Sequence, residues 1–104
     1  MEIYDKNFKE EVIESTHPVL LEFWASWCVP CKQIEWLLKD LDEEYKGKVK
    51  IVKLNVDRNR KTPIQYRITG IPTFMTFNNG TVIETQVGSQ SAEVLKKMIE
   101  KALK

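Results

Sequence analysis

A nearly continuous apolar run at residues 19–25 constrains the fold of this 104-residue chain more than any other feature. The run reads Val-Leu-Leu-Glu-Phe-Trp-Ala, which is typical of a strand buried on both faces of a sheet. An amphipathic helix is predicted at residues 29–45, and Gly47 ends it. A second strand is predicted at residues 50–56. Because a long helix separates the two strands, we expect them to run parallel in one sheet.

The N-terminal segment predicts two short elements before the buried strand. Residues 2–4 are expected to form an edge strand, and residues 6–14 place their apolar side chains along one face of a helix. Asp5 stands where the N-cap of that helix is expected, and His17-Pro18 ends the helix.

The second half of the chain predicts a hairpin between two helices. Its elements are a short helix at residues 59–66, strands at residues 73–77 and 81–87, and a last helix capped by Ser91. Asn78-Asn79-Gly80 between the two strands is a strong hairpin signal. The expected fold class is therefore α/β, with a central mixed sheet of four to five strands and helices on both faces. One domain covering residues 1–104 is expected at this length.

The charge balance and the N-terminus exclude several classes of function. Sixteen basic and fifteen acidic side chains give a net charge of +1, so neither a nucleic-acid nor a membrane partner is expected. The first residues lack the basic and apolar regions of a secretory signal, and no segment approaches the length of a membrane span. We therefore expect a cytoplasmic protein.

The two cysteines, Cys28 and Cys31, lie where the buried strand gives way to the long helix. Unpaired N–H groups and the helix dipole at a helix N-terminus stabilise a thiolate, which should lower the pKa of Cys28. The thiolate is the attacking species in disulfide exchange. Cys31 is within reach one turn later and can resolve a mixed disulfide, and Pro30 fits the first turn of a helix.

Two other interpretations of the cysteine pair are open. It is either an inert pair, or part of a metal site. A closed zinc site needs four ligands, whereas the chain has two cysteines and a single histidine, His17, which we expect in a turn or at the surface. A dimer sharing a metal cluster through two pairs is a remote alternative. No phosphate-binding glycine loop is present, so no organic cofactor is expected.

The residues around the cysteines resemble the active-site motif of the thioredoxin family. The motif is Trp27-Cys28-Val29-Pro30-Cys31-Lys32, preceded by Phe23-Trp24-Ala25 as in that family. Later segments resemble the family in the same order: Lys53-Leu54-Asn55-Val56-Asp57, Tyr66-Arg67-Ile68-Thr69-Gly70-Ile71-Pro72-Thr73, Phe77-Asn78-Asn79-Gly80 and Val87-Gly88. A lone C-x-x-C pair is weak evidence, but an ordered set over essentially the whole chain is specific.

The resemblance implies a thioredoxin fold and a protein-disulfide reductase. It makes Cys28 the nucleophile, Cys31 the resolving thiol and Pro72 a cis-proline facing them. It also implies a shallow apolar groove for an extended substrate segment, lined by Trp27, Val29, Pro30, Gly70, Ile71, Pro72 and Gly88. The implied partners are disulfide-containing target proteins and a thioredoxin reductase of unspecified type, and the protein is expected to be a monomer.

Glu22 departs from the family pattern because thioredoxins usually have an aspartate at this place in the strand. That aspartate helps to move the proton of the resolving cysteine. We expect Glu22 to have the same role, with a raised pKa and with Lys53 nearby. Its extra methylene is expected to shift the carboxyl toward Cys31 or to place a water between them. The alternative is a Glu22 that faces solvent on an edge strand.

Val29 and Trp36 are two further departures. Val29 replaces the usual glycine between the cysteines, which adds apolar surface at the rim of the groove and is expected to change redox potential or partner choice. Trp36 stands where many thioredoxins have a helix-kinking proline, so a straighter helix is expected. We expect Trp36 to be partly exposed, and either to pack against Lys32 or to mark a contact surface.

Three rival functions have discriminating tests. An oxidant or isomerase for secreted proteins is disfavoured by the missing signal and by Pro30. A binding module with incidental redox activity would still work after both cysteines were replaced by serine. A metal-bridged dimer would show metal in the purified protein.

Overall fold

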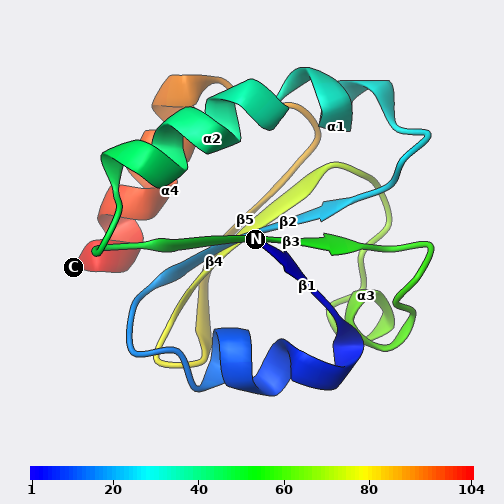
Figure 1. Ribbon diagram of the computed structural model, residues 1–104, viewed down its shortest axis with the longest axis horizontal. Helices are drawn as coiled ribbons and strands as arrows, with labels where there is room; N and C mark the ends of the chain where they lie inside the picture. Colours follow the sequence, from blue (N-terminus) through cyan, green and yellow to red (C-terminus); the bar gives the residue numbers. More distant parts are fainter.

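A computed structural model describes all residues from 1 to 104 and contains one five-stranded mixed sheet (Figure 1). The strands are β1 (Glu2–Ile3), β2 (Val19–Trp24), β3 (Lys50–Asn55), β4 (Thr73–Asn78) and β5 (Thr81–Val87), in the spatial order β1-β3-β2-β4-β5. The parallel strands β1, β3 and β2 form one half, and the antiparallel β4–β5 hairpin forms the other. This arrangement confirms the expected fold class, the parallel first strands and the short edge strand.

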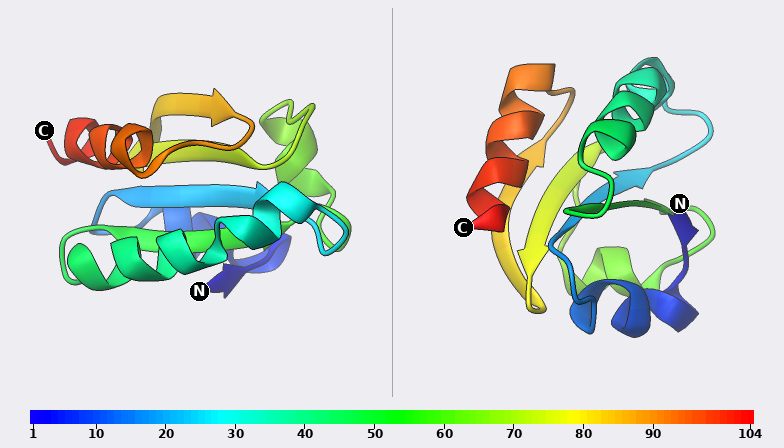
Figure 2. Two further views of the ribbon diagram at one scale, coloured as in Figure 1. Left: turned by 90° about the horizontal axis from the view of Figure 1, so that it is seen from above. Right: turned by 60° about the vertical axis from the view of Figure 1, so that its left-hand side comes forward.

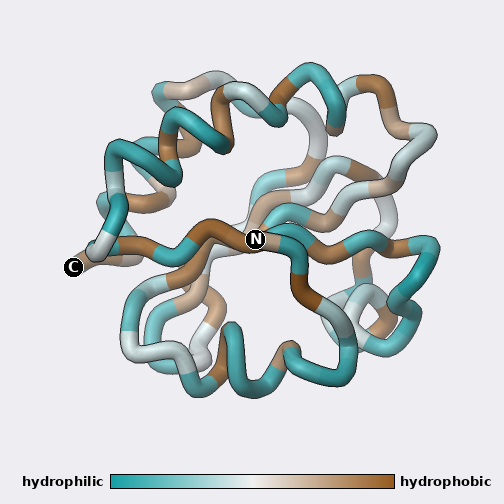
Figure 3. The backbone as a smooth tube through the Cα atoms, viewed as in Figure 1, coloured by the Kyte–Doolittle hydropathy of each residue, from teal (hydrophilic) through white to brown (hydrophobic).

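Helices cover both faces of the sheet (Figure 2). One face carries α1 (Val29–Gln33), α2 (Glu35–Glu44) and α4 (Ala92–Leu103). The other carries a 3-10 turn, η1 (Asp5–Asn7), a π-helical turn, η2 (Lys9–Ile13), and the short helix α3 (Lys61–Gln65). Polar and apolar residues alternate along α2 and α4, as expected for helices with one buried face (Figure 3).

The core has two layers because side chains of a strand alternate between the faces of the sheet. Leu20 and Ile51 pack with α2 and α4 on one side, whereas Leu21 and Val52 pack with the N-terminal turns on the other. The second layer includes an aromatic cluster of Phe8, Tyr66 and Phe77, with ring centroids 5.6 to 6.1 Å apart. Glu22 shares the face of Leu20, two residues earlier along β2, and therefore lies on the face that α1, α2 and α4 cover.

The turn and the last helix match their sequence signals. Asn79 and Gly80 both have positive φ angles, 51° and 77°, as a two-residue hairpin turn of this kind requires. A side chain at Gly80 would also come within 3.0 Å of the carbonyl oxygen of Ile13. The Ser91 hydroxyl accepts a 3.2 Å hydrogen bond from the N–H of Val94, which confirms the predicted N-cap of α4.

The expected single helix at residues 29–45 is interrupted at Ile34, between α1 and α2. The expectation of one unbroken helix is therefore wrong, whereas the expectation of a straighter helix without the proline stays a prediction. Ile34 stands at the junction, with φ −93° and ψ −5°, and its side chain is buried in the core layer under α2. Isoleucine is not a helix-breaking residue, so no local sequence signal marks this junction.

The predicted role of Asp5 is also wrong. The N-terminal segment forms the turns η1 and η2 instead of one regular helix, and Asp5 does not cap it. Its carboxylate instead accepts hydrogen bonds from the backbone N–H groups of Lys61 and Thr62, at 3.0 and 2.9 Å, and from the Thr62 hydroxyl at 2.6 Å. Asp5 thus caps α3, more than fifty residues away.

Candidate active site

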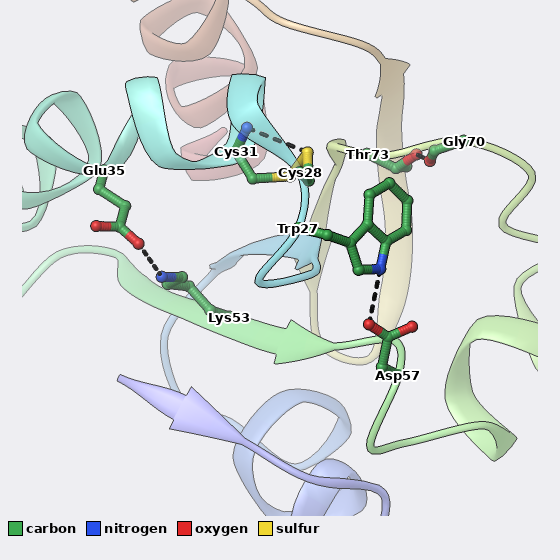
Figure 4. The surroundings of a disulfide bond; sticks show 8 residues. All are labelled: Trp27, Cys28, Cys31, Glu35, Lys53, Asp57, Gly70 and Thr73. Atoms are coloured by element: carbon green, nitrogen blue, oxygen red, sulfur yellow. Dashed lines mark hydrogen bonds and ion pairs between the residues drawn. A yellow bond between two sulfur atoms is a disulfide. The ribbon is translucent and has the colours of Figure 1, made fainter.

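A disulfide joins Cys28 and Cys31 in the first turn of α1 (Figure 4). β2 ends at Trp24, a short loop follows, and Cys28 is the N-cap residue of α1, in extended backbone geometry. The two Cα atoms are 5.3 Å apart, within the usual range for a disulfide. Both cysteines are buried, Cys28 being 3% and Cys31 1% exposed. The cysteines therefore lie between the end of a strand and the start of a helix, as the sequence predicted.

The sulfur of Cys28 lies where the helix N-terminus can stabilise negative charge. It accepts a 3.2 Å hydrogen bond from the backbone N–H of Cys31, one of the first amides of α1. Pro30 lies in the first turn, where its missing N–H costs no helical bond. After reduction, the same N–H and the helix dipole would stabilise a thiolate at Cys28.

Trp27, immediately before Cys28, is held at the surface by a hydrogen bond. Its indole is 67% exposed, and its Nε1 donates to the Asp57 carboxylate at 2.8 Å. Figure 4 shows this ring beside the disulfide. The sequence did not identify Asp57 as a site residue. Asp57 follows the end of β3 in the chain, and only the tertiary fold brings its side chain to Trp27. This hydrogen bond holds the indole in place at the surface beside the disulfide.

The peptide bond between Ile71 and Pro72 is cis, as expected from the resemblance. Ile71 packs against the cluster that contains both cysteines, and the carbonyl of Pro72 accepts a 2.7 Å hydrogen bond from the N–H of Gly88. The cis-proline segment and the end of β5 therefore lie together beside the disulfide.

The expected groove residues do not all line one pocket. A surface pocket beside the disulfide is lined by Trp27, Val56, Pro63, Ile68, Gly70 and Ile71, among others. Pro30 lines a separate pocket with Trp36, Ser89 and Gln90, on the other side of α1. Val29 is exposed, and neither it nor Pro72 nor Gly88 lines either pocket. The predicted groove through all seven residues therefore stays a prediction.

Glu22 is the most unusual group of the site. It is 1% exposed on a central strand, which rules out the solvent-facing alternative. Neither carboxyl oxygen has a hydrogen-bond partner. Burial raises the pKa of Glu22 to about 8; the positive charge of Lys53 works against this rise, and the negative charges of Glu35 and Glu2 add to it.

Lys53 is beside Glu22 in register but is not paired with it. The two residues face each other across β2 and β3. The Lys53 ammonium nevertheless contacts the Glu35 carboxylate at 3.3 Å (Figure 4). It also lies 4.2 Å from the centroid of the Trp24 ring. The expectation that Lys53 is near is confirmed, while the carboxylate it actually contacts was not predicted.

Trp36 and His17 lie where the sequence placed them. Trp36 is 65% exposed, as expected, and its packing against Lys32 stays a prediction. His17 is an exposed residue of the loop before β2, and its ring contacts the Thr16 hydroxyl.

None of the helices has both the length and the apolar character needed to cross a membrane.

A disulfide at the start of a helix, directly after the central strand of a mixed sheet and beside a cis-proline, defines a thiol–disulfide oxidoreductase. The family model for thioredoxin matches residues 1–101. The thioredoxin of Rickettsia conorii is 44% identical over 101 residues, which cover 97% of this chain and 96% of that protein. The thioredoxin of Haemophilus influenzae is 49% identical over 89 residues, covering 86% and 83% respectively. The chain belongs to the thioredoxin family and is a protein-disulfide oxidoreductase.

Proposed function

We propose that this protein reduces disulfides in other proteins through its Cys28–Cys31 pair. The observation that carries the proposal is the buried disulfide at the N-terminus of α1, where the backbone N–H of Cys31 donates to the sulfur of Cys28. Disulfide-containing targets and a recycling reductase are general features of the family. The direction of electron flow, from this protein to its targets, is what we add.

The reaction has two exchange steps. The Cys28 thiolate attacks one sulfur of the target disulfide, a mixed disulfide forms, and the other target sulfur leaves as a thiolate that takes up a proton. Cys31 then loses its proton and attacks the Cys28 sulfur, which releases the second target thiol. Two electrons pass to the target and the disulfide between Cys28 and Cys31 forms again. A thioredoxin reductase, of flavin or iron–sulfur type, restores the dithiol.

Glu22 is proposed to accept the proton of Cys31 in the second step, directly or through a water. Its position supports this role, because the carboxyl is buried on the face of the sheet that carries α1 with its cysteines, and it has no partner of its own. Only the ionised carboxylate can accept a proton. Since the pKa of Glu22 is raised to about 8, the resolving step should accelerate as the pH rises through that region. Lys53 is proposed to modulate this titration.

Targets are proposed to bind in extended form across the surface around the disulfide. Trp27, Val29, Pro30, Gly70, Ile71, Pro72 and Gly88 are the proposed contacts. Val29 and Trp27 supply exposed apolar surface at the rim, and the Ile71–Pro72 segment lies next to the disulfide in a position to offer backbone groups.

The remaining proposals concern the setting of the reaction. We propose a single-domain monomer, residues 1–104, that acts in the cytoplasm without a cofactor and without nucleic-acid or membrane partners. The near-neutral charge supports the absence of a polyanionic partner, and a reducing compartment would keep the dithiol available.

Two serine variants test the order of the steps. Incubated with a disulfide-bonded peptide, a Cys31→Ser protein should accumulate a mixed disulfide, because Cys28 attacks and nothing resolves it. The matched Cys28→Ser protein should accumulate none. The opposite distribution, seen by mass spectrometry under non-reducing conditions, would refute the assigned roles.

The reduction potential tests the direction of electron flow. Equilibration with a dithiol redox buffer should give a reduction potential of about −270 mV for the Cys28–Cys31 pair, which is characteristic of thioredoxins. A value near about −120 mV, characteristic of strong oxidants, would instead support an oxidase.

A further inference from the structure

Four ionisable side chains lie on the face of the sheet that α1 and α2 cover. Glu2, Lys53 and Glu22 form a row across β1, β3 and β2, because Lys53 is the register partner of both glutamates. Register partners project to the same face of a sheet, which here is the face under α1 and α2. Glu35, at the start of α2, adds a third carboxyl group above the row. The cluster thus holds three carboxyl groups and one ammonium, and of these carboxyl groups the ammonium contacts only that of Glu35.

The hydrogen-bond donors of this cluster are distributed unequally. The Glu2 carboxylate accepts bonds from the Trp24 indole N–H at 3.0 Å and from the Asn55 backbone N–H at 3.1 Å. The Glu35 carboxylate accepts from the Lys53 ammonium at 3.3 Å. Glu22 receives no bond at either oxygen. The buried carboxyl is therefore the one left without a donor, although its register partner carries an ammonium.

We propose that Glu35 is a positioning residue that holds the Lys53 ammonium away from Glu22 and thereby keeps the Glu22 carboxyl protonated. An ammonium turned toward Glu22 would favour the charged carboxylate, because opposite charges attract strongly where water is excluded. The Glu35 carboxylate (Figure 4) and the face of the Trp24 ring hold the ammonium in its present place. Glu35 acts on the proton of Glu22 only through Lys53 and through its own negative charge.

Other charged groups near the cluster do not reproduce this effect. Lys39 and Asp42 on α2 line the same surface pocket as Glu35 and Lys53, but neither is among the charges that shift the pKa of Glu22. The N-terminal ammonium of Met1 also lines it and donates to the carbonyl of Ile51 at 3.3 Å. The neighbouring disulfide carries no charge. Glu35 and Glu2 are thus the acidic groups that face Glu22, and Glu2 is already occupied by other donors.

The inference rests on the proposed function and deepens it, because a Glu22 that keeps its own proton cannot accept the proton of Cys31. Glu35 would set the pH at which Glu22 begins to act as a base. It lies four residues after Cys31, outside the sulfur pair, so its replacement leaves both thiols in place.

An NMR titration of the Glu22 carboxyl in the oxidised protein tests the inference directly, with Glu22→Gln to assign the signal. In Glu35→Gln we expect the midpoint to fall by about one pH unit or more, because a negative charge is lost and Lys53 is released. Glu35→Asp should retain most of the wild-type midpoint. Glu43→Gln removes the same charge from an exposed position of α2 and should leave the midpoint in place. An unchanged midpoint in Glu35→Gln, or an equal shift in Glu43→Gln, would overturn the inference.

The rate of resolution measured against pH separates this inference from the role of Glu22. If the midpoint falls in Glu35→Gln and the rate profile moves with it, both proposals stand. If the midpoint falls and the profile stays, Glu35 controls Glu22 but Glu22 is not the proton acceptor. If the midpoint stays, the inference fails whatever the profile does.

Discussion

The substitution Glu22→Gln should make the oxidised protein more stable at alkaline pH and leave it nearly unchanged in mild acid. Burial raises the pKa of Glu22 from an ordinary value of 4.5 to about 8 in the folded protein. Between those values the folded state holds a proton that the unfolded chain releases, so stability falls as the pH rises. Each pKa unit is worth about 1.4 kcal/mol, which makes the full loss on the order of 5 kcal/mol above pH 8.

Urea unfolding of the oxidised protein, from about pH 5 to about pH 9, measures this effect without interference from free thiols. The wild-type free energy of unfolding should fall across that range relative to Glu22→Gln, whose amide does not titrate. Gln loses no hydrogen bond here, because Glu22 makes none. Glu43→Gln, on the exposed face of α2, is the matched control and should follow the wild type. A constant difference between wild type and Glu22→Gln at every pH would refute the reasoning.

Three further substitutions test the contacts that hold the fold. Ser91→Ala removes the N-cap of α4 and should lower the free energy of unfolding by about 1 kcal/mol in urea titrations. Asp5→Ala should cost a similar amount at neutral pH. Burial opposes ionisation of Asp5, but its hydrogen bonds to Thr62 and Lys61 outweigh burial and lower its pKa, so its contribution should vanish as the pH falls below the ordinary value of 3.8. Phe77→Ala empties the centre of the aromatic cluster and should cost about 3–5 kcal/mol in thermal or urea unfolding.

Local sequence signals predicted those parts of the fold that depend on neighbours along the chain. The apolar run of β2 is a central strand, the Asn79-Gly80 turn has the two positive φ angles of its type, and Ser91 caps the helix that it precedes. The cis bond before Pro72 is different, because only the family resemblance predicted it. Taken alone, that proline fits an ordinary strand edge.

The predictions that failed depend on distant contacts. Asp5 has the residue type of an N-cap, but its acceptor oxygens are taken by amides of α3, which the chain reaches more than fifty residues later. The break at Ile34 stands at a buried core residue that is not a helix breaker. Likewise, register places Lys53 beside Glu22, but register alone does not reveal that α2 brings Glu35 to the same ammonium. For Asp5 and Lys53, a group from a distant part of the chain takes the partner that local sequence suggested for another.

The buried acid connects the stability of this protein with its chemistry. The same loss of hydration that raises the pKa of Glu22 also destabilises the folded state once that group ionises. A glutamine at position 22 would remove both the free-energy cost of ionisation and the proton acceptor. The variant should therefore be more stable at alkaline pH and lose the pH-dependent part of the rate at which Cys31 resolves the mixed disulfide. Glu35 extends this coupling because it holds the Lys53 ammonium in an ion pair. Glu22 therefore lacks a counter-ion that would lower its pKa and reduce the free-energy cost of ionising it in the folded protein. Releasing Lys53 should therefore stabilise the protein at alkaline pH and move proton transfer to lower pH, two changes that arise from one contact.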